Sequence, residues 1–267
     1  MEVSFHITDS CNLNCKSCLH MVPLSAGYHY FIDTYIEPQL KLLAKRKNII
    51  NILNIMGGEP TLHPDIIKIL YIARENLPET KIRISTNGTN LNIFNDTNFI
   101  TAILENKIEV AVTQYPYSQY AEKNYEMLYS ILNTNKIPYI SGKITKFLTQ
   151  PFVKNLNNDI NVYKWCKSFH YCTMVKDFKL YVCHLAAYVN LLKEKFPDLD
   201  WIEIDDNSYV DLTDENLTDE QILTKLSSLS IICKHCAELN RWWSSDVPGD
   251  MIDWAKSELL KEEWIKE

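Results

Sequence analysis

The chain has 267 residues, of which 46% are hydrophobic and 23% are charged, and its formal net charge is −7. This composition is that of a globular protein, and the length suits one large domain or one domain with an appendage. A negative chain is a poor partner for nucleic acid. No run approaches the roughly 18 apolar residues of a membrane span, and the first residues lack a secretory signal pattern. We therefore expect a cytoplasmic protein whose eight cysteines stay reduced and serve metal binding or catalysis.

The first 160 residues alternate strand patterns with helix patterns. The expected strands are 2–8, 49–56, 81–86, 108–113 and 136–140, and the expected helices are 31–47, 65–76, 96–105 and 120–134. This order predicts an α/β domain over residues 1–160, with a parallel sheet or a partial barrel and helices outside it; of these we expect a partial (β/α)6 barrel. Ligands of such folds bind at the carboxyl ends of the strands.

Beyond residue 160 the alternation stops, and the sequence predicts a small second unit over residues 161–267. We expect a β-hairpin over 173–182 that turns near Asp177 and Phe178. A capping-box pattern from Thr218 to Gln221 predicts the start of a short helix. Residues 251–266 have the pattern of an amphipathic helix that covers the sheet.

Three cysteines follow the first expected strand within eight residues, at Cys11, Cys15 and Cys18. A structural zinc ion would need a fourth ligand, for which His20 is available. A [4Fe–4S] cluster also takes four ligands, usually thiolates, so three cysteines would leave one iron open. An open metal position is a place for a substrate to bind, as it is in catalytic zinc sites.

Two glycine-containing segments stand at the ends of the next two expected strands. Residues 56–60 read Met-Gly-Gly-Glu-Pro, and residues 85–88 read Ser-Thr-Asn-Gly. The chain has only six glycines, and three of them fall in these two segments. Either segment alone is typical of a strand-to-helix turn, but with the cysteines they form an ordered series at consecutive strand ends.

This series resembles the radical S-adenosylmethionine (radical SAM) enzymes, over roughly residues 1–145. The resemblance implies that Cys11, Cys15 and Cys18 hold a [4Fe–4S] cluster whose open iron binds S-adenosylmethionine. It also implies reductive cleavage of that cofactor to a 5′-deoxyadenosyl radical, which abstracts a hydrogen atom from the substrate. Ser17 stands where many members carry an aromatic residue beside the adenine, so the adenine contact is left open.

The resemblance also implies a set of cofactor-binding residues at the ends of the second and third strands. Glu59 would accept a hydrogen bond from the cofactor's ammonium group, and glycine allows the backbone to approach the ligand closely. The whole set is Met56, Gly57, Gly58, Glu59, Ser85 and Asn87.

Five further cysteines lie in the second unit, at Cys166, Cys172, Cys183, Cys233 and Cys236. Four thiolates at such spacings can hold a structural zinc ion or an auxiliary [4Fe–4S] cluster. A cysteine, a hairpin, another cysteine and a Cys-x-x-Cys pair, in this order, resemble the twitch module of radical SAM enzymes, known from 2-deoxy-scyllo-inosamine dehydrogenase. The related SPASM module holds two auxiliary clusters, for which five cysteines are too few.

The resemblance implies Cys166, Cys183, Cys233 and Cys236 as the four ligands, with Cys172 as an alternative ligand. If Cys172 is free, it is either a small buried hydrophobe or the hydrogen-atom donor that radical epimerases need. Phe178 stands where the twitch pattern has a turn glycine.

A fully ligated second cluster can accept an electron, which favours oxidation of a carbinol to a ketone. The candidate bases for the hydroxyl proton are Lys143, Lys146, His170 and His184. We expect a sugar-like or cyclitol-like small-molecule substrate and a flavodoxin- or ferredoxin-type reductant. The alternatives are a radical epimerase, a peptide-modifying enzyme, and a non-catalytic protein with a structural zinc or iron–sulfur site. Because the sequence begins at the first expected strand, we expect no peptide-recognition domain ahead of the barrel.

Overall fold

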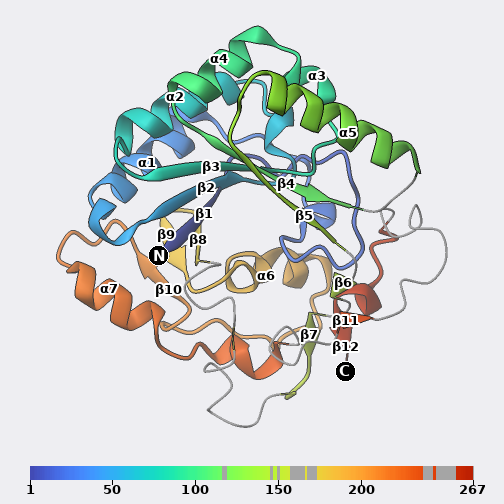
Figure 1. The fold of residues 1–267 in the computed structure, drawn as a ribbon. Helices are drawn as coiled ribbons and strands as arrows, with labels where there is room; N and C mark the ends of the chain where they lie inside the picture. The colour runs from blue at the N-terminus through green and yellow to red at the C-terminus, as the bar shows by residue number, and fades with distance from the viewer. Residues whose placement is uncertain are drawn as a thin grey trace.

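The structure is a computed structural model that describes residues 1–115, 119–144, 147–148, 151–156, 166, 173–236, 243–244 and 257–266. Eight strands form one central sheet (Figure 1). In chain order they are β1 (Glu2–His6), β2 (Ile52–Met56), β3 (Lys81–Thr86), β4 (Glu109–Gln114), β5 (Tyr139–Lys143), β8 (Thr173–Lys176), β9 (Lys179–Tyr181) and β10 (Tyr209–Asp211). Four two-residue strands pair outside this sheet, β6 (Phe147–Leu148) with β11 (Trp243–Ser244) and β7 (Phe152–Val153) with β12 (Ile265–Lys266).

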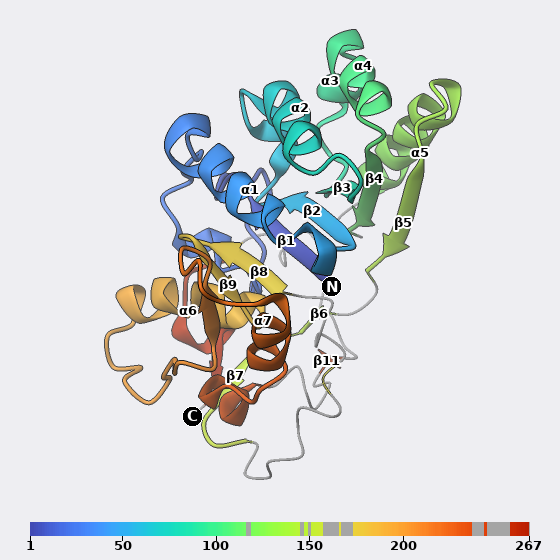
Figure 2. The same cartoon turned by 90° about the vertical axis from the view of Figure 1, so that its left-hand side faces the viewer.

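The strand order is β10-β9-β8-β1-β2-β3-β4-β5. Pairing is parallel from β8 through β5, and β9 and β10 extend the sheet in antiparallel pairs. The predicted α/β fold with a parallel partial barrel is therefore confirmed. The sixth parallel strand, β8, pairs with β1 at the side away from β5, as Figure 2 shows, so the sheet stays open within the described residues.

Helices lie on both faces of the curved sheet. Figure 1 shows α1 to α5 along its outer face and α6 on the other side. The helices are α1 (Glu37–Ala44), α2 (Ile66–Asn76), α3 (Leu91–Phe94), α4 (Thr97–Glu105), α5 (Gln119–Thr134), α6 (His184–Lys195) and α7 (Asp219–Leu226). A π-helical turn spans Ile32–Ile36, and 3-10 turns span Val22–Leu24, Lys47–Ile49, Pro60–Leu62, Ile231–His235 and Lys261–Glu263.

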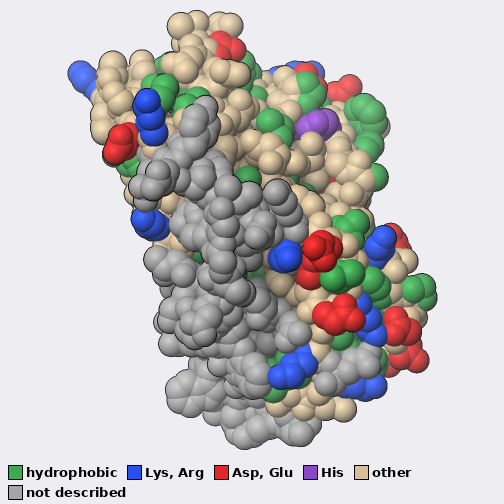
Figure 3. Space-filling view, turned by 90° about the vertical axis from the view of Figure 1, so that its right-hand side faces the viewer, with side chains coloured by type: hydrophobic (Ala, Val, Ile, Leu, Met, Phe, Trp, Pro, Cys, Tyr) green, Lys and Arg blue, Asp and Glu red, His purple; other side chains and the backbone are tan. Residues whose placement is uncertain are grey.

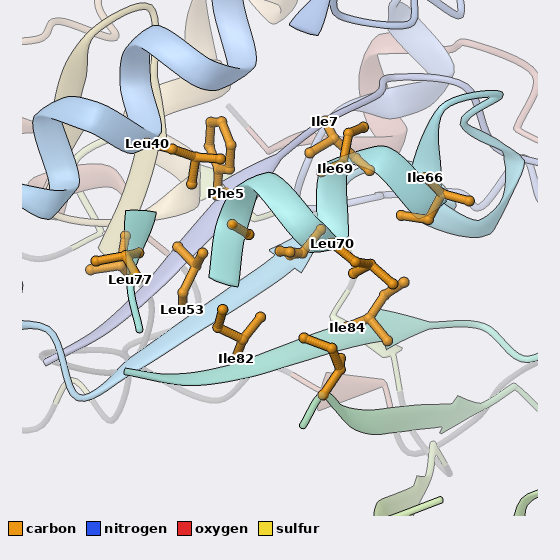
Figure 4. Close-up of a cluster of buried hydrophobic side chains, with 14 of the residues drawn as sticks. Phe5, Ile7, Leu40, Leu53, Ile66, Ile69, Leu70, Leu77, Ile82 and Ile84 are labelled. Atoms are coloured by element: carbon orange, nitrogen blue, oxygen red, sulfur yellow. The ribbon is translucent and has the colours of Figure 1, made fainter. Parts of the chain in front are cut away.

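Alternation along the inner strands separates an apolar outer face from a polar inner face. In β1, Val3 and Phe5 are fully buried in the main core, whereas the intervening Ser4 and His6 are buried polar side chains outside it. Figure 4 shows Phe5 and Ile7 packed against side chains from α1 and α2. Burying each large apolar side chain contributes roughly 1.5–3 kcal/mol, so this layer fixes the register of the strands and of the loops that follow them.

A second apolar core lies on the other side of β8. Met174 of β8 and Tyr181 of β9 pack there with buried residues of α6, including Leu185 and Tyr188. The sheet thus runs continuously from the strands before residue 160 into the hairpin after it. The expected division at residue 160 remains a prediction.

The predicted hairpin turn is confirmed at Asp177 and Phe178, which join β8 to β9 with φ values of 49° and 63°. Left-handed backbone is unfavourable for a bulky residue without glycine's freedom. Side chains from the region of α1 hold the turn, because Tyr35 Oη accepts from Asp177 N at 3.1 Å and Gln39 Oε1 accepts from Phe178 N at 2.9 Å. This explains how Phe178 replaces the expected glycine.

Two helix predictions have different outcomes. The capping box is confirmed, because Thr218 Oγ1 accepts from Gln221 N and Gln221 Oε1 accepts from Thr218 N at the start of α7. The helix expected over 251–266 is wrong for residues 257–266, which form an irregular segment, a 3-10 turn and β12. Backbone pairing of this segment with β7 replaces helical hydrogen bonding. Residues 251–256 lie outside the described part.

Charged side chains of both signs are interspersed on the face shown in Figure 3. Within the part of the chain that the structure describes, no helix is long and apolar enough to cross a membrane.

We expect Gly57→Ala to destabilise the protein by about 1–3 kcal/mol, the usual cost of an overpacked site. A Cβ at Gly57 would lie 2.3 Å from the carbonyl oxygen of Thr8, which belongs to backbone and cannot rotate away. Urea unfolding of the metal-free protein measures the effect. Gly142→Ala is the matched control, because a Cβ there meets nothing within 4 Å. Equal unfolding midpoints for the two variants would contradict this account.

Candidate functional site

The loop that leaves β1 carries Cys11, Cys15 and Cys18 to one cavity of about 120 Å³. All three side chains line that cavity. Between them the chain turns sharply, with Ser17 in left-handed backbone at φ 53°. The three thiols thus meet at one cavity from a single loop, and their role as cluster ligands remains a prediction.

The cofactor-binding residues expected at the ends of the second and third strands reach the same cavity, with one exception. Strand β2 ends at Met56 and is followed by Gly57 and Gly58. Ser85 is the last residue but one of β3, and Asn87 directly follows that strand. All five residues line the cavity together with the cysteines. They meet because parallel strands present their carboxyl ends at one edge of the sheet. The exception is Glu59, which is fully buried behind the lining.

Glycine at positions 57 and 58 allows two loops to touch through their backbones. Gly58 N donates to Thr8 O and Glu59 N donates to Ser10 O, both at 2.8 Å. A Cβ on Gly58 would lie 2.3 Å from Ser10 O. The close approach predicted for these glycines is thus made to the loop that leads into Cys11, which fixes where that loop begins.

Glu59 ties the end of β2 to the end of β3. Its Oε1 accepts from Thr61 N at 3.1 Å, Thr61 Oγ1 at 2.6 Å and Thr86 Oγ1 at 2.7 Å, and its Oε2 accepts from Asn87 N at 2.7 Å. Burial raises the pKa of Glu59, and these four donors oppose that rise. The geometry gives Glu59 a positioning role, and its contact with an ammonium group remains a prediction.

Asn87 extends this network to the cysteine loop. Its Nδ2 donates to Asn12 Oδ1 at 2.9 Å and lies 3.9 Å from Cys11 Sγ. Its Oδ1 accepts from Thr89, whose hydroxyl in turn accepts from Asn12 Nδ2 at 2.6 Å. The residue beside the first cysteine is therefore held by the loop after β3.

Thr113 and Tyr115, which belong to none of the sequence motifs, bring the end of β4 to the cavity. Burial raises the pKa of Tyr115 far above its usual range, so its hydroxyl stays protonated. Tyr125 of α5 aligns this strand end with its neighbour, because its Oη accepts from Tyr115 N at 3.0 Å and donates to Asn87 O at 2.9 Å. The rule that places ligands at strand ends could have pointed to both residues, since Thr113 ends the fourth expected strand and Tyr115 follows it.

His20 also lines the cavity and belongs to a buried chain of rings. His20 Nδ1 lies 2.9 Å from His6 Nε2, and its ring centroid lies 5.2 Å from that of His184. Burial holds the pKa of His20 well below its usual range, so the ring is neutral. Within the described residues, no three His, Cys, Asp or Glu side chains are placed to hold a single metal ion.

The donor set fits an iron–sulfur cluster that leaves one position for another ligand. Thiolates are the usual ligands of such clusters, and three thiols line the cavity together. Burial raises the pKa of Cys11 to about 12 and also raises the pKa values of Cys15 and Cys18. The metal-free thiols are therefore protonated at neutral pH, and cluster binding must release protons.

Three of the cysteines expected to bind a second cluster pack against the second core. Cys183 is the residue before α6, and Cys233 and Cys236 lie on and after the 3-10 turn Ile231–His235; all three pack against this core. Burial raises the pKa of Cys233 to about 11, and Cys166 adds to the rise through its nearby charge. Cys172 lies outside the described residues.

Of the candidate bases, His184 is buried and Lys143 is exposed at the end of β5. Lys146 and His170 lie outside the described residues. Of the two candidates that the structure describes, His184 lies near the cavity, through its contact with the ring of His20.

Residues 5–112 match the radical SAM superfamily. The chain is 31% identical over 84 residues to a GTP 3′,8-cyclase of Photorhabdus laumondii, covering 31% of this chain and 25% of the cyclase. It is 32% identical over 93 residues to an S-adenosylmethionine-dependent nucleotide dehydratase of Selenomonas ruminantium, covering 33% of this chain and 30% of the dehydratase. The chain thus spans less than a third of the length of these relatives.

Solved structures superpose on parts of the chain at lower identity. BtrN in complex with AdoMet and 2-DOIA superposes with a TM-score of 0.49 and 15% identity, over 72% of this chain and 74% of BtrN. Native anSMEcpe with bound AdoMet superposes with a TM-score of 0.44 and 18% identity, over 55% of this chain and 44% of anSMEcpe.

We expect Glu59→Gln to lower the free energy of unfolding by about 1–3 kcal/mol, because a buried donor then loses its acceptor. In wild type each carboxyl oxygen accepts from a protein donor, Oε1 from Thr86 Oγ1 and Oε2 from Asn87 N. Whichever oxygen the NH₂ group replaces, a donor then faces another donor. Urea unfolding of the metal-free protein measures the loss. Glu105→Gln, at an exposed position of α4, should change stability by less than about 0.5 kcal/mol. If Glu59→Gln loses no more free energy of unfolding than Glu105→Gln does, Glu59 has no positioning role.

Proposed function

We propose, from the match of residues 5–112 to the radical SAM superfamily, that the chain is a radical SAM oxidoreductase of a small hydroxylated molecule. In this proposal, Cys11, Cys15 and Cys18 hold a [4Fe–4S] cluster, and Cys166, Cys183, Cys233 and Cys236 hold an auxiliary one. The substrate is a sugar or cyclitol whose carbinol is oxidised to a ketone.

One observation supports the first part most strongly. Three thiols, the backbone of Gly57 and Gly58, and the side chains of Ser85 and Asn87 line a single cavity. Soft thiolates suit iron–sulfur clusters, while the surrounding backbone and polar groups suit the amino-acid and ribose parts of S-adenosylmethionine. When bound, the cluster supplies the electron that cleaves this cofactor to a 5′-deoxyadenosyl radical.

The chain's own residues then have distinct tasks. Gly57 and Gly58 offer backbone groups to the cofactor, and Ser85 and Asn87 offer side-chain hydrogen bonds. Tyr115, with a protonated hydroxyl in the same cavity, can donate a hydrogen bond to bound cofactor or substrate. Glu59 holds two of these loops together from behind.

The inner face of the sheet favours a polar substrate. On β1 and β2, Ser4, His6 and Asn54 alternate with core residues, so the inner face of these two strands is polar. His184, beside His20, is the candidate base that the geometry favours for the hydroxyl proton. The auxiliary cluster would take the remaining electron. This task needs no open iron, so four protein ligands are the simplest arrangement.

We expect protein reconstituted anaerobically with iron and sulfide, then reduced, to convert S-adenosylmethionine into 5′-deoxyadenosine. Cys15→Ala should abolish this product, because a cluster with two protein ligands loses its site. Chromatography and mass spectrometry of the small-molecule products measure the reaction. Wild-type protein that carries an intact cluster and makes no 5′-deoxyadenosine would refute the proposed chemistry.

Iron analysis tests the second site independently. With about four irons for each cluster, the wild-type chain should bind about eight, and Cys233→Ala should bind about four. This variant should still form 5′-deoxyadenosine without oxidising substrate, because the first three cysteines are unchanged. Wild-type protein with about four irons and one zinc would instead make the second site structural.

A further inference from the structure

We infer that Trp264 is a positioning residue for the cysteine loop after β1, and that residues 257–266, here called the strap, connect this loop to the segment that carries Cys236. The inference deepens the proposed function, since it concerns the loop that would hold the first cluster. It stands on contacts that neither the family match nor the sequence motifs include.

The strap contacts the cysteine loop at three residues, Asn14, Ser17 and Cys18. Asn14 and Ser257 pair through two hydrogen bonds, Ser257 N to Asn14 O at 2.6 Å and Asn14 Nδ2 to Ser257 O at 3.1 Å. Ser17 Oγ donates to the carbonyl oxygen of Glu263. The contacts of Asn14 and Ser17 lie on either side of Cys15. Asn14 belongs to the three residues between Cys11 and Cys15, and Ser17 belongs to the two residues between Cys15 and Cys18.

Trp264 makes the third contact, directly to a cysteine. Its indole Nε1 donates to Cys18 O at 3.3 Å, and the same carbonyl accepts from Met21 N at 2.8 Å. Both lone pairs of the Cys18 carbonyl are therefore engaged, which fixes the peptide plane after Cys18. The Cα–Cβ bond of Cys18 leaves the same backbone, so the fixed plane limits the positions that the thiol can take.

The rest of the strap holds Trp264 in place. Its side chain is fully buried, and together with Ile265 it belongs to the second core. Glu263 closes the strap on itself, because its carboxyl oxygens accept from Ser257 Oγ and from Glu258 N. The strap is thus a folded unit with its own hydrogen bonds.

The other end of the strap reaches the second set of cysteines. Trp264 O accepts from Phe152 N at 3.0 Å as β12 pairs with β7. Phe152 also forms an antiparallel bridge with Cys236. One tryptophan therefore links the carbonyl of Cys18 to the strand that borders Cys236.

Trp264→Phe removes the indole N–H but keeps an aromatic ring in the core. We expect Cys18 in the metal-free protein to be alkylated about fivefold faster, the factor that corresponds to the loss of one net hydrogen bond. Trp201→Phe is the matched control, because Trp201 packs against the same core without an observed bond to the cysteine loop. Alkylation rates at each cysteine are followed by peptide mass spectrometry.

A second measurement separates positioning from general stability. After reconstitution and reduction, the electron paramagnetic resonance signal on addition of S-adenosylmethionine should be altered in Trp264→Phe and unchanged in Trp201→Phe. Ser17→Ala, which removes another strap contact, should accelerate alkylation in the same direction and serves if Trp264→Phe fails to fold. Equal alkylation rates for Trp264→Phe, Trp201→Phe and wild type would overturn the inference. The alkylation test needs no cluster, so it can succeed even if the proposed chemistry fails.

Discussion

The site depends on the hydrogen bonds that the buried carboxyl group of Glu59 accepts. Four protein donors from the ends of β2 and β3 converge on it, and breaking any one would leave a buried polar group unsatisfied. Beside it, Gly57 and Gly58 let the loop after β1 rest on the loop after β2. Three strand ends are thereby fixed relative to one another before any ligand binds.

This constraint explains how a loop with three cysteines can be preorganised. The start of the loop is set by backbone contact with Gly58, its second residue is held by Asn87, and its last cysteine is held by Trp264. Burial raises the pKa values of the thiols, so the metal-free loop keeps them neutral. Preorganisation of this kind reduces the ordering cost that a bound group would otherwise meet.

Successive side chains of a strand point to opposite faces of the sheet, so polar and apolar side chains can lie on different faces. Outward side chains such as Phe5 and Ile7 build the main core with α1 and α2, as Figure 4 shows. Inward residues such as Ser4 and Asn54 can then stay polar without weakening that core. The second core around α6 supports β8 and the strap, and through Trp264 it also supports the cysteine loop after β1.

The sequence by itself determined the order of strands β1 to β5, the cysteine loop and the two glycine segments, because these depend on local periodicity and on motifs placed at strand ends. It also located the turn at Asp177 and Phe178. Only the tertiary structure decided that β8 pairs with β1, that Glu59 bonds protein donors, and that Tyr115 reaches the cavity. Residues 257–266 were expected to be helical, yet contacts with Asn14, Cys18 and Phe152 give them another form. Those contacts join residues more than a hundred positions apart, and no local pattern encodes such distant pairings.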